Sequence, residues 1–173
     1  MKILFTALFT AVTFLKGYSQ NNYINWHDNT KIRWADFKGV VETSSPFAAM
    51  SAVGINYKYN SVSKGKAVEV SFEINAAFDK TKSWSKRSEQ TVNTLKHEQL
   101  HFDICEVVSR EFRKEAEQTV YTKNYKNEIT RIFNRYTREL QKLQKKYDDQ
   151  TRHSKNKTKQ KEWENLIHQE LAR

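Results

Sequence analysis

One stretch of the chain, Leu95-Lys96-His97-Glu98-Gln99-Leu100-His101, contains the spacing His-Glu-x-x-His. Residues four apart lie one above the other on the same face of a helix, so His97 and His101 can direct two imidazole nitrogens at a single metal ion. Glu98 projects to the side of that face, where it can reach a water molecule at the ion without displacing it. The stretch therefore predicts a helix that binds zinc, with Glu98 as a general base.

The His-Glu-x-x-His spacing is a specific signal. Five His and 14 Glu in 173 residues would produce it by chance only about 0.01 times per chain. The alternative interpretation is a pair of buried histidines in a helix core, with Glu98 as a surface charge. The low chance frequency favours the metal site.

A catalytic zinc ion generally takes three protein ligands and leaves one position open for water, so a third ligand is required. Cys105 lies about 12 Å along the helix from His97, and Asp103 lies about 200° around the helix from His101, so neither can complete the site. The ligand must come from elsewhere in the chain. The open candidates are His27, His153, His168, Glu139, Asp148 and Asp149.

The second half of the chain is predicted to be helical, because no glycine or proline follows residue 65. We expect one helix over residues 88–117, a second over residues 125–147, a polar loop over residues 147–156 and a short closing helix over residues 159–172. The second helix is marked by apolar residues at steps of three and four. This apolar stripe consists of Tyr125, Ile129, Ile132, Tyr136, Leu140, Leu143 and Tyr147.

The first half is predicted to contain strands. Val68, Val70 and Phe72 alternate with polar residues over positions 67–73, which is the pattern of a half-buried strand. Residues 48–59 predict a partner strand, residues 60–65 the turn between them, and residues 32–37 a third strand. The whole chain is therefore expected to be α+β, with a small antiparallel sheet from residues 25–80 followed by the metal-binding helix and a second long helix packed on it. A helical bundle with a loose β cap is the alternative.

The N-terminus has the pattern of an export signal. Met1-Lys2 carries a positive charge, residues 3–15 form an apolar run, and Gly17 and Ser19 are the small residues that a signal peptidase reads. We expect a signal peptide over residues 1–19 and a single domain over residues 20–173. A membrane-spanning helix would need about 20 apolar residues, which no other segment provides. The mature protein is therefore expected to be secreted or periplasmic, with an uncleaved helix as the alternative.

The formal charge of +10 is concentrated over residues 123–161. The basic stripe of the second helix consists of Arg131, Arg135, Arg138, Lys142 and Lys145. It lies about 140° around that helix from the apolar stripe, as a solvated face would. Nucleic-acid binding would need aromatic rings exposed among the basic residues, whereas the aromatic residues here belong to the apolar stripe. We expect no nucleic-acid partner.

Several blocks of the sequence resemble a family of secreted bacterial proteins known as domain of unknown function 922 and described as zinc-dependent proteases. These blocks are Trp34-Ala35-Asp36-Phe37-Lys38-Gly39, Ser83-Trp84, HEQLHFDI over residues 97–104, and YDDQTRH over residues 147–153, followed by Gln160 and Trp163. The resemblance spans most of the mature chain. The sequence departs from the family's pattern at Leu100 and Ser154, where glycine is common.

Together with the motif, the resemblance implies a zincin-like fold, the fold of zinc peptidases built around such a helix. The part of the resemblance over residues 147–153 favours His153 as the third metal ligand beside His97 and His101. Tyr147 is expected in the core, although its hydroxyl could instead stabilise an oxyanion.

The implied activity is that of a secreted zinc metallopeptidase. It would hydrolyse peptide bonds of a peptide or protein substrate, with zinc as cofactor and Glu98 as general base. Two alternatives stay open. One is a zinc amidase acting on peptidoglycan peptides or another amide. The other is a noncatalytic envelope protein with a structural or degenerate zinc site, whose basic stripe binds anionic polymers.

Overall fold

The computed structural model describes residues 22–65 and 67–173, and its fold is α+β, as predicted. The predicted signal peptide over residues 1–19 lies outside the described residues. In chain order the elements are β1 (Tyr23–Asn25), the 3-10 helix η1 (Trp34–Asp36), β2 (Ala49–Met50), β3 (Val53–Lys64), β4 (Ala67–Asp79), β5 (Trp84–Ser85), the 3-10 helix η2 (Arg87–Glu89), α1 (Val92–Gln118), α2 (Tyr125–Thr151) and α3 (Lys157–Leu171).

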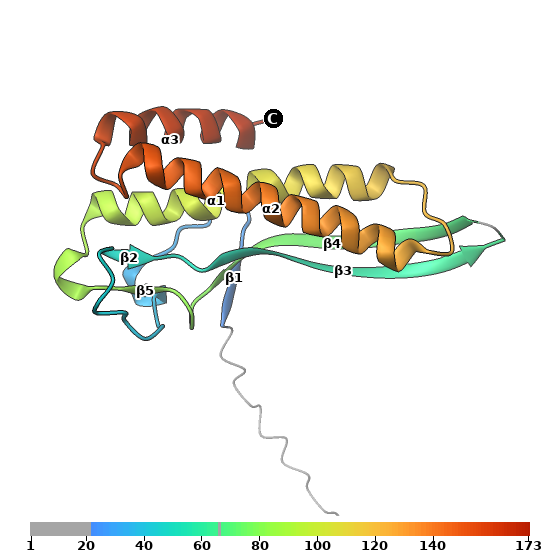
Figure 1. Cartoon of the computed structure of the whole chain (residues 1–173), viewed down its shortest axis with the longest axis horizontal. Coiled ribbons are helices and arrows are strands. Elements are labelled where there is room, and N and C mark those ends of the chain that lie inside the picture. The colour runs from blue at the N-terminus through green and yellow to red at the C-terminus, as the bar shows by residue number, and fades with distance from the viewer. Residues whose placement is uncertain (1–21, 66) are drawn as a thin grey trace, which may run out of the picture.

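A long antiparallel hairpin supports the helices (Figure 1). β3 and β4 pair from Val53 opposite Phe78 at one end to Lys64 opposite Ala67 at the other, and β1 adds to the free edge of β4. Gly65 stands at the hairpin turn with a φ of +67°, a left-handed conformation that costs glycine little. β2 and β5 form a second, two-stranded sheet at the end of the molecule far from this turn.

The three helices lie on one face of the hairpin. α1 runs along β4, α2 returns beside α1, and α3 covers the ends of both helices that lie far from the hairpin turn (Figure 1). The apolar stripe of α2 faces this interior, where its residues are buried or half-buried, as predicted. One core joins both halves of the chain; its largest fully buried side chains include Phe78, Phe102, Phe112 and Tyr147. None of the described helices is long and apolar enough to cross a membrane.

The prediction of a strand over residues 32–37 is wrong. Trp34–Asp36 forms a 3-10 turn that is stabilised locally, because the Arg33 amide donates to Asp36 Oδ2 over 2.9 Å. The Ile32 amide is bound by the side chain of Gln99 on α1 rather than by a neighbouring strand. The third strand of the sheet is β1 instead.

Two strand boundaries also differ from the prediction. Residues 60–64, predicted as part of a turn, continue β3, because each of them pairs with a residue of β4. The predicted strand over residues 48–59 is interrupted after Met50, where the Ala52 amide donates to Ser83 Oγ over 2.9 Å. This interruption separates β2 from β3 and lets β2 pair with β5.

The predicted loop over residues 147–156 starts too early. α2 continues to Thr151, whose buried hydroxyl donates to the Tyr147 carbonyl over 2.7 Å and so satisfies a polar group inside the helix packing. Asp148 therefore lies on a regular helix. The connection to α3 is short, and Arg152, His153 and Ser154 all have left-handed φ angles, of 49°, 50° and 71°.

Candidate metal centre

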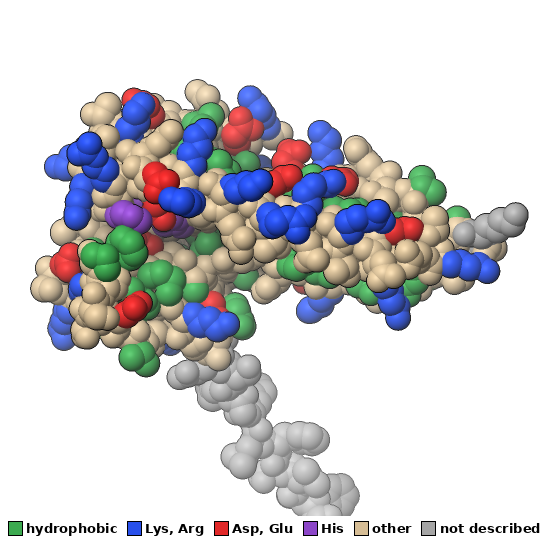
Figure 2. All heavy atoms as spheres, viewed as in Figure 1, with side chains coloured by type: hydrophobic (Ala, Val, Ile, Leu, Met, Phe, Trp, Pro, Cys, Tyr) green, Lys and Arg blue, Asp and Glu red, His purple; other side chains and the backbone are tan. Residues whose placement is uncertain are grey.

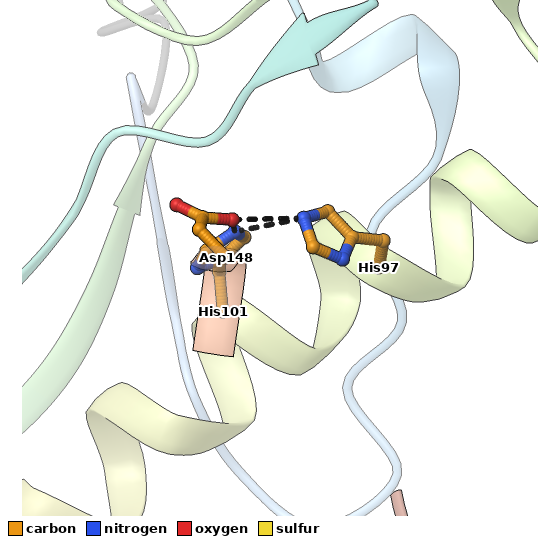
Figure 3. A group of neighbouring side chains, drawn as sticks. All are labelled: His97, His101 and Asp148. Atoms are coloured by element: carbon orange, nitrogen blue, oxygen red, sulfur yellow. Dashed lines mark hydrogen bonds and ion pairs between the residues drawn. The ribbon is translucent and has the colours of Figure 1, made fainter. Parts of the chain in front are cut away.

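Two histidines of α1 and one aspartate of α2 meet beneath α3. The Nε2 atoms of His97 and His101 lie 3.2 Å apart, and each lies 3.1 Å from Asp148 Oδ1 (Figure 3). The helical spacing of four brings the two imidazoles to one face of α1, and α2 returns beside α1 so that its last turns face them. The three ligand atoms thus converge on one point between two helices.

This arrangement fits a zinc ion. Two ligands that are each about 2.0–2.1 Å from a tetrahedral ion lie about 3.3 Å from each other, close to the spacing of these three atoms. Among the described residues, His97, His101 and Asp148 form a group whose ligand atoms all lie within 4.8 Å of one another. Two imidazoles and a carboxylate, with a position left open, are a donor set typical of catalytic zinc.

The charges of the site also suit a cation. Burial alone would raise the pKa of the Asp148 carboxyl, but hydrogen bonds and the charges of His101 and His97 hold it well below its usual range. Burial would lower the pKa of His101, yet the hydrogen bond with Asp148 and the carboxylate of Glu98 raise it above its usual value. Asp148 and Glu98 therefore place negative charge next to the histidines, where a cation would also be stabilised.

Two glutamines orient the imidazole rings. His97 Nδ1 contacts Gln160 Oε1 of α3 over 3.1 Å, and His101 Nδ1 contacts Gln144 Oε1 of α2. Because a carbonyl oxygen only accepts, both Nδ1 atoms carry the proton, which leaves both Nε2 lone pairs directed at the converging point. Gln144 also donates from Nε2 to the His101 carbonyl over 2.9 Å, so it holds both the ring and the backbone of that residue.

Tyr147 forms the floor behind the histidines. Its ring is fully buried and stacks on His97 with centroids 4.6 Å apart. Its hydroxyl donates to Gln160 Oε1 over 2.8 Å, and burial raises its pKa above the ordinary value. The hydroxyl is thus bound to the group that orients His97.

Glu98 has an unsatisfied oxygen and lines the cleft that the three ligand residues also line. The residue is 4% exposed and lines the same cleft as both histidines. Its Oε2 is buried and makes no hydrogen bond within the described part of the chain. A buried carboxylate oxygen without a partner costs about 1–3 kcal/mol or more, so a group that donates to it is expected at this position. A water molecule in the open position of the metal would be such a donor.

The centre opens into a cleft of about 510 Å³. One wall is the segment over residues 47–55, which includes β2 and the start of β3. The other wall is the last part of α2 together with His153 and Ser154 of the following loop. A molecule that enters the cleft would therefore meet Glu98 and the three ligand residues.

The other candidates for the third ligand lie farther from the centre or face away from it. Asp149 is exposed and pairs with Lys145, and Glu139 is exposed beside Arg135. His27 and His168 are both exposed, and neither lines the cleft. These four residues do not meet the two histidines of α1.

His153, the predicted third ligand, lies at the cleft but outside the group of three converging residues. Its Nδ1 lies 3.4 Å from Asp148 Oδ1, and its ring packs on Phe47 with centroids 4.2 Å apart. The geometry favours Asp148 as the third ligand, with His153 beside it. The ligand role of His153 stays a prediction.

The sequence interpretation gave no role to Gln144 and Gln160 at the metal centre. A signal for Gln144 was present, because it precedes Asp148 by four residues and so shares its helix face. Because the helix was predicted to end at residue 147, Asp148 was not placed on the same helix face as Gln144. No local pattern indicates that Gln160 of α3 would lie beside His97, since the contact joins residues 63 positions apart.

The family model described as "Bacterial protein of unknown function (DUF922)" matches residues 33–154. The chain belongs to this family. No curated protein and no solved structure matches the chain. The matched range contains His97, Glu98, His101, Asp148 and His153, so the whole converging group lies within it, while Gln160 lies beyond it.

Proposed function

We propose that this member of the DUF922 family is a secreted zinc metallopeptidase of zincin type. The observation that carries the proposal is the buried Oε2 of Glu98, which has no partner among the described residues, in a residue that lines the same cleft as three ligand atoms lying 3.1–3.2 Å apart. The export pattern of the N-terminus supports a site of action outside the cytoplasm.

His97, His101 and Asp148 would hold the zinc ion, and Gln144 and Gln160 would fix the two imidazoles in the tautomer that binds metal. When bound, zinc polarises the carbonyl of the scissile bond and lowers the pKa of the attacking water. Glu98 takes the proton from that water and passes it to the nitrogen of the leaving amine. This proton transfer requires a carboxylate oxygen without other partners, and Glu98 Oε2 has none within the described part of the chain.

The cleft suits an extended polypeptide. β3 is an edge strand of the three-stranded sheet, and Val53, Gly54 and Ile55 from its start line the cleft. An edge strand can bind another backbone through its unpaired amide and carbonyl groups. Phe47 and Met50, each 38% exposed, add apolar surface for substrate side chains on the same wall.

A purely structural zinc site would explain less of this arrangement. Structural zinc sites are closed by four protein ligands, whereas three residues converge here and the site opens into a cleft. Nor does a structural site require an unpartnered carboxylate oxygen next to the ion. These two features favour the enzyme over a noncatalytic envelope protein.

The test is a digest of a broad peptide library by the purified mature protein loaded with zinc, analysed by mass spectrometry. Cleavage is expected that a chelator abolishes and that added zinc restores. Glu98→Gln should bind zinc as the wild type does and cleave about 10²–10⁴ times more slowly, because only the general base is removed. Zinc loss in Glu98→Gln would instead make Glu98 a ligand.

Peptidoglycan fragments form a second arm of the same assay. Chelator-sensitive cleavage of these fragments alone would make the protein a zinc amidase rather than a general peptidase. An absence of chelator-sensitive cleavage in both arms, from protein that contains stoichiometric zinc, would overturn the enzyme proposal.

A further inference from the structure

α2 presents three different faces to its surroundings. Six of its residues line the cleft: Thr137, Gln141, Gln144 and Asp148 share one face, and Phe133 and Leu140 lie on the side of this face toward the apolar stripe. At about 100° per residue, this cleft face lies about 110° from the basic stripe on one side and about 110° from the apolar stripe on the other. Arg138 is a helical neighbour of Gln141, three residues on, so the basic stripe comes nearest to the cleft at this position.

The basic stripe is exposed and only partly neutralised. Arg135 pairs with Glu115, and Lys145 pairs with Asp149 over 2.8 Å. In contrast, Arg138 and Lys142 form no ion pair with any residue that the structure describes. Figure 2 shows the row of Lys and Arg side chains along α2, with histidine at one end of it. The rim of the cleft on the α2 side thus has uncompensated positive charge.

The opposite wall of the cleft is different. The sequence over residues 43–57 contains no charged residue. Hydrophobic side chains lie below the histidine in Figure 2, on the side away from the basic row. A ligand that fits both walls needs apolar groups toward residues 47–55 and negative charges toward α2.

We propose that the cleft recognises polypeptide segments in which acidic residues flank the position of cleavage, with the acidic side chains bound by Arg138 and Lys142. This inference rests on the proposed peptidase function and assigns its substrate class. An acidic polypeptide combines side chains for the apolar wall, a backbone for the edge of β3 and carboxylates for the basic stripe. A polyanion without apolar groups would use the basic stripe alone.

The test compares two labelled peptides with the same apolar centre, one flanked by Glu and the other by Gln. Their binding to zinc-loaded Glu98→Gln is measured by fluorescence anisotropy, so that cleavage does not interfere. The acidic peptide is expected to bind roughly tenfold more tightly at low salt, since each exposed charge pair contributes modestly. The preference should shrink at high salt, because the charges are on the surface.

A charge-reversal pair identifies the surface. Arg138→Glu with Lys142→Glu, added to Glu98→Gln, should remove the preference for the acidic peptide. The matched control is Lys58→Glu with Lys114→Glu, which changes the net charge equally. The Tyr57 ring faces Phe112 of α1, so Lys58 points to the other side of the sheet, and Lys114 lies in a hollow beside Arg173. The control should keep the preference.

If the reversal pair fails to fold, Arg138→Gln with Lys142→Gln is the substitute and should reduce the preference in the same direction. Equal binding of both peptides, or loss of the preference in the control pair as well, would overturn the inference. Two competitors should also differ: polyglutamate that carries apolar residues should displace the acidic peptide at a lower charge concentration than polyphosphate does. Equal displacement by the two competitors would likewise overturn the inference. Cleavage by the wild type reports separately on the peptidase function, so either claim can fail without the other.

Discussion

The two ends of the α1–α2 helix pair are stabilised in different ways. Toward the hairpin turn, the helices and the sheet are joined by aromatic rings: Phe112 packs against both Tyr57 and Phe133, with ring centroids 5.8 and 6.0 Å away, and these two rings also contact each other over 4.8 Å. Toward α3, the same two helices are joined by buried polar groups. Among them, His97 is hydrogen-bonded to Gln160 and stacks on the ring of Tyr147.

This difference separates stability from function. Aromatic rings stabilise the fold by removing apolar surface from water, and their contacts need little directional precision. Buried polar groups contribute only when each has a partner, and a chain that needed stability alone would gain by replacing them. The proposed metal site would account for the polar end, where Glu98 Oε2 still lacks a partner among the described residues.

The largest effect is expected at the aromatic end. Phe112→Ala removes a fully buried ring and should lower the free energy of unfolding by about 3–5 kcal/mol, measured by urea denaturation. The fraction that remains folded should still bind one zinc ion per chain, because Phe112 does not touch the metal centre. Loss of zinc from folded Phe112→Ala would show that metal binding at one end of the helix pair depends on the aromatic packing at the other end.

An intermediate effect is expected from the polar end. Gln160→Met preserves the length of the side chain but removes the oxygen that holds His97 Nδ1 and the Tyr147 hydroxyl. Loss of such an outer partner typically lowers metal affinity about 10–100-fold, which competition with a chelator dye would measure. The matched control is Gln169→Met at an exposed position of the same helix, where affinity should not change. Equal affinities for the two variants would mean that Gln160 does not orient His97.

The smallest effect is expected from a surface pair that joins the last turn of α1 to the first half of α2. A hydrogen bond from Arg135 holds the pKa of the Glu115 carboxyl below its ordinary value. A lowered pKa stabilises the folded state above the unfolded pKa, and this contribution is lost as the pH falls through the folded-state pKa. The Glu115 side chain is 36% exposed, so solvent screens the pair and its contribution should stay below about 1 kcal/mol.

Unfolding of the wild type and Glu115→Gln should therefore differ slightly at pH 7 and converge at pH values below the range in which Glu115 titrates. Urea denaturation across this pH range measures the difference. A gap that widens on acidification would have the wrong sign for a lowered pKa. The wild type and Glu115→Gln should have the same zinc content, since Glu115 is remote from the metal centre.

The helical half and the candidate site were largely predictable from local patterns. The apolar stripe of α2 and the face shared by His97 and His101 follow from the helical repeat alone. The prediction of a strand over residues 32–37 is wrong because the side chain of Gln99, 67 positions away, binds the Ile32 amide. The position of Asp148 was missed for a related reason: the polar residues after Tyr147 suggest a loop, whereas packing of Thr151 against the core extends the helix. Long-range contacts of this kind leave no periodic signal in the sequence.

The central claim is that His97, His101 and Asp148 hold one zinc ion. Elemental analysis of the purified mature protein after gel filtration tests it most directly, on the wild type and on Asp148→Ala, His153→Ala and Asp149→Ala. One zinc ion per chain is expected in the wild type, in His153→Ala and in Asp149→Ala, and little or none in Asp148→Ala, because two histidines alone bind zinc weakly. Full zinc content in Asp148→Ala together with its loss in His153→Ala would contradict the account and restore His153 as the third ligand.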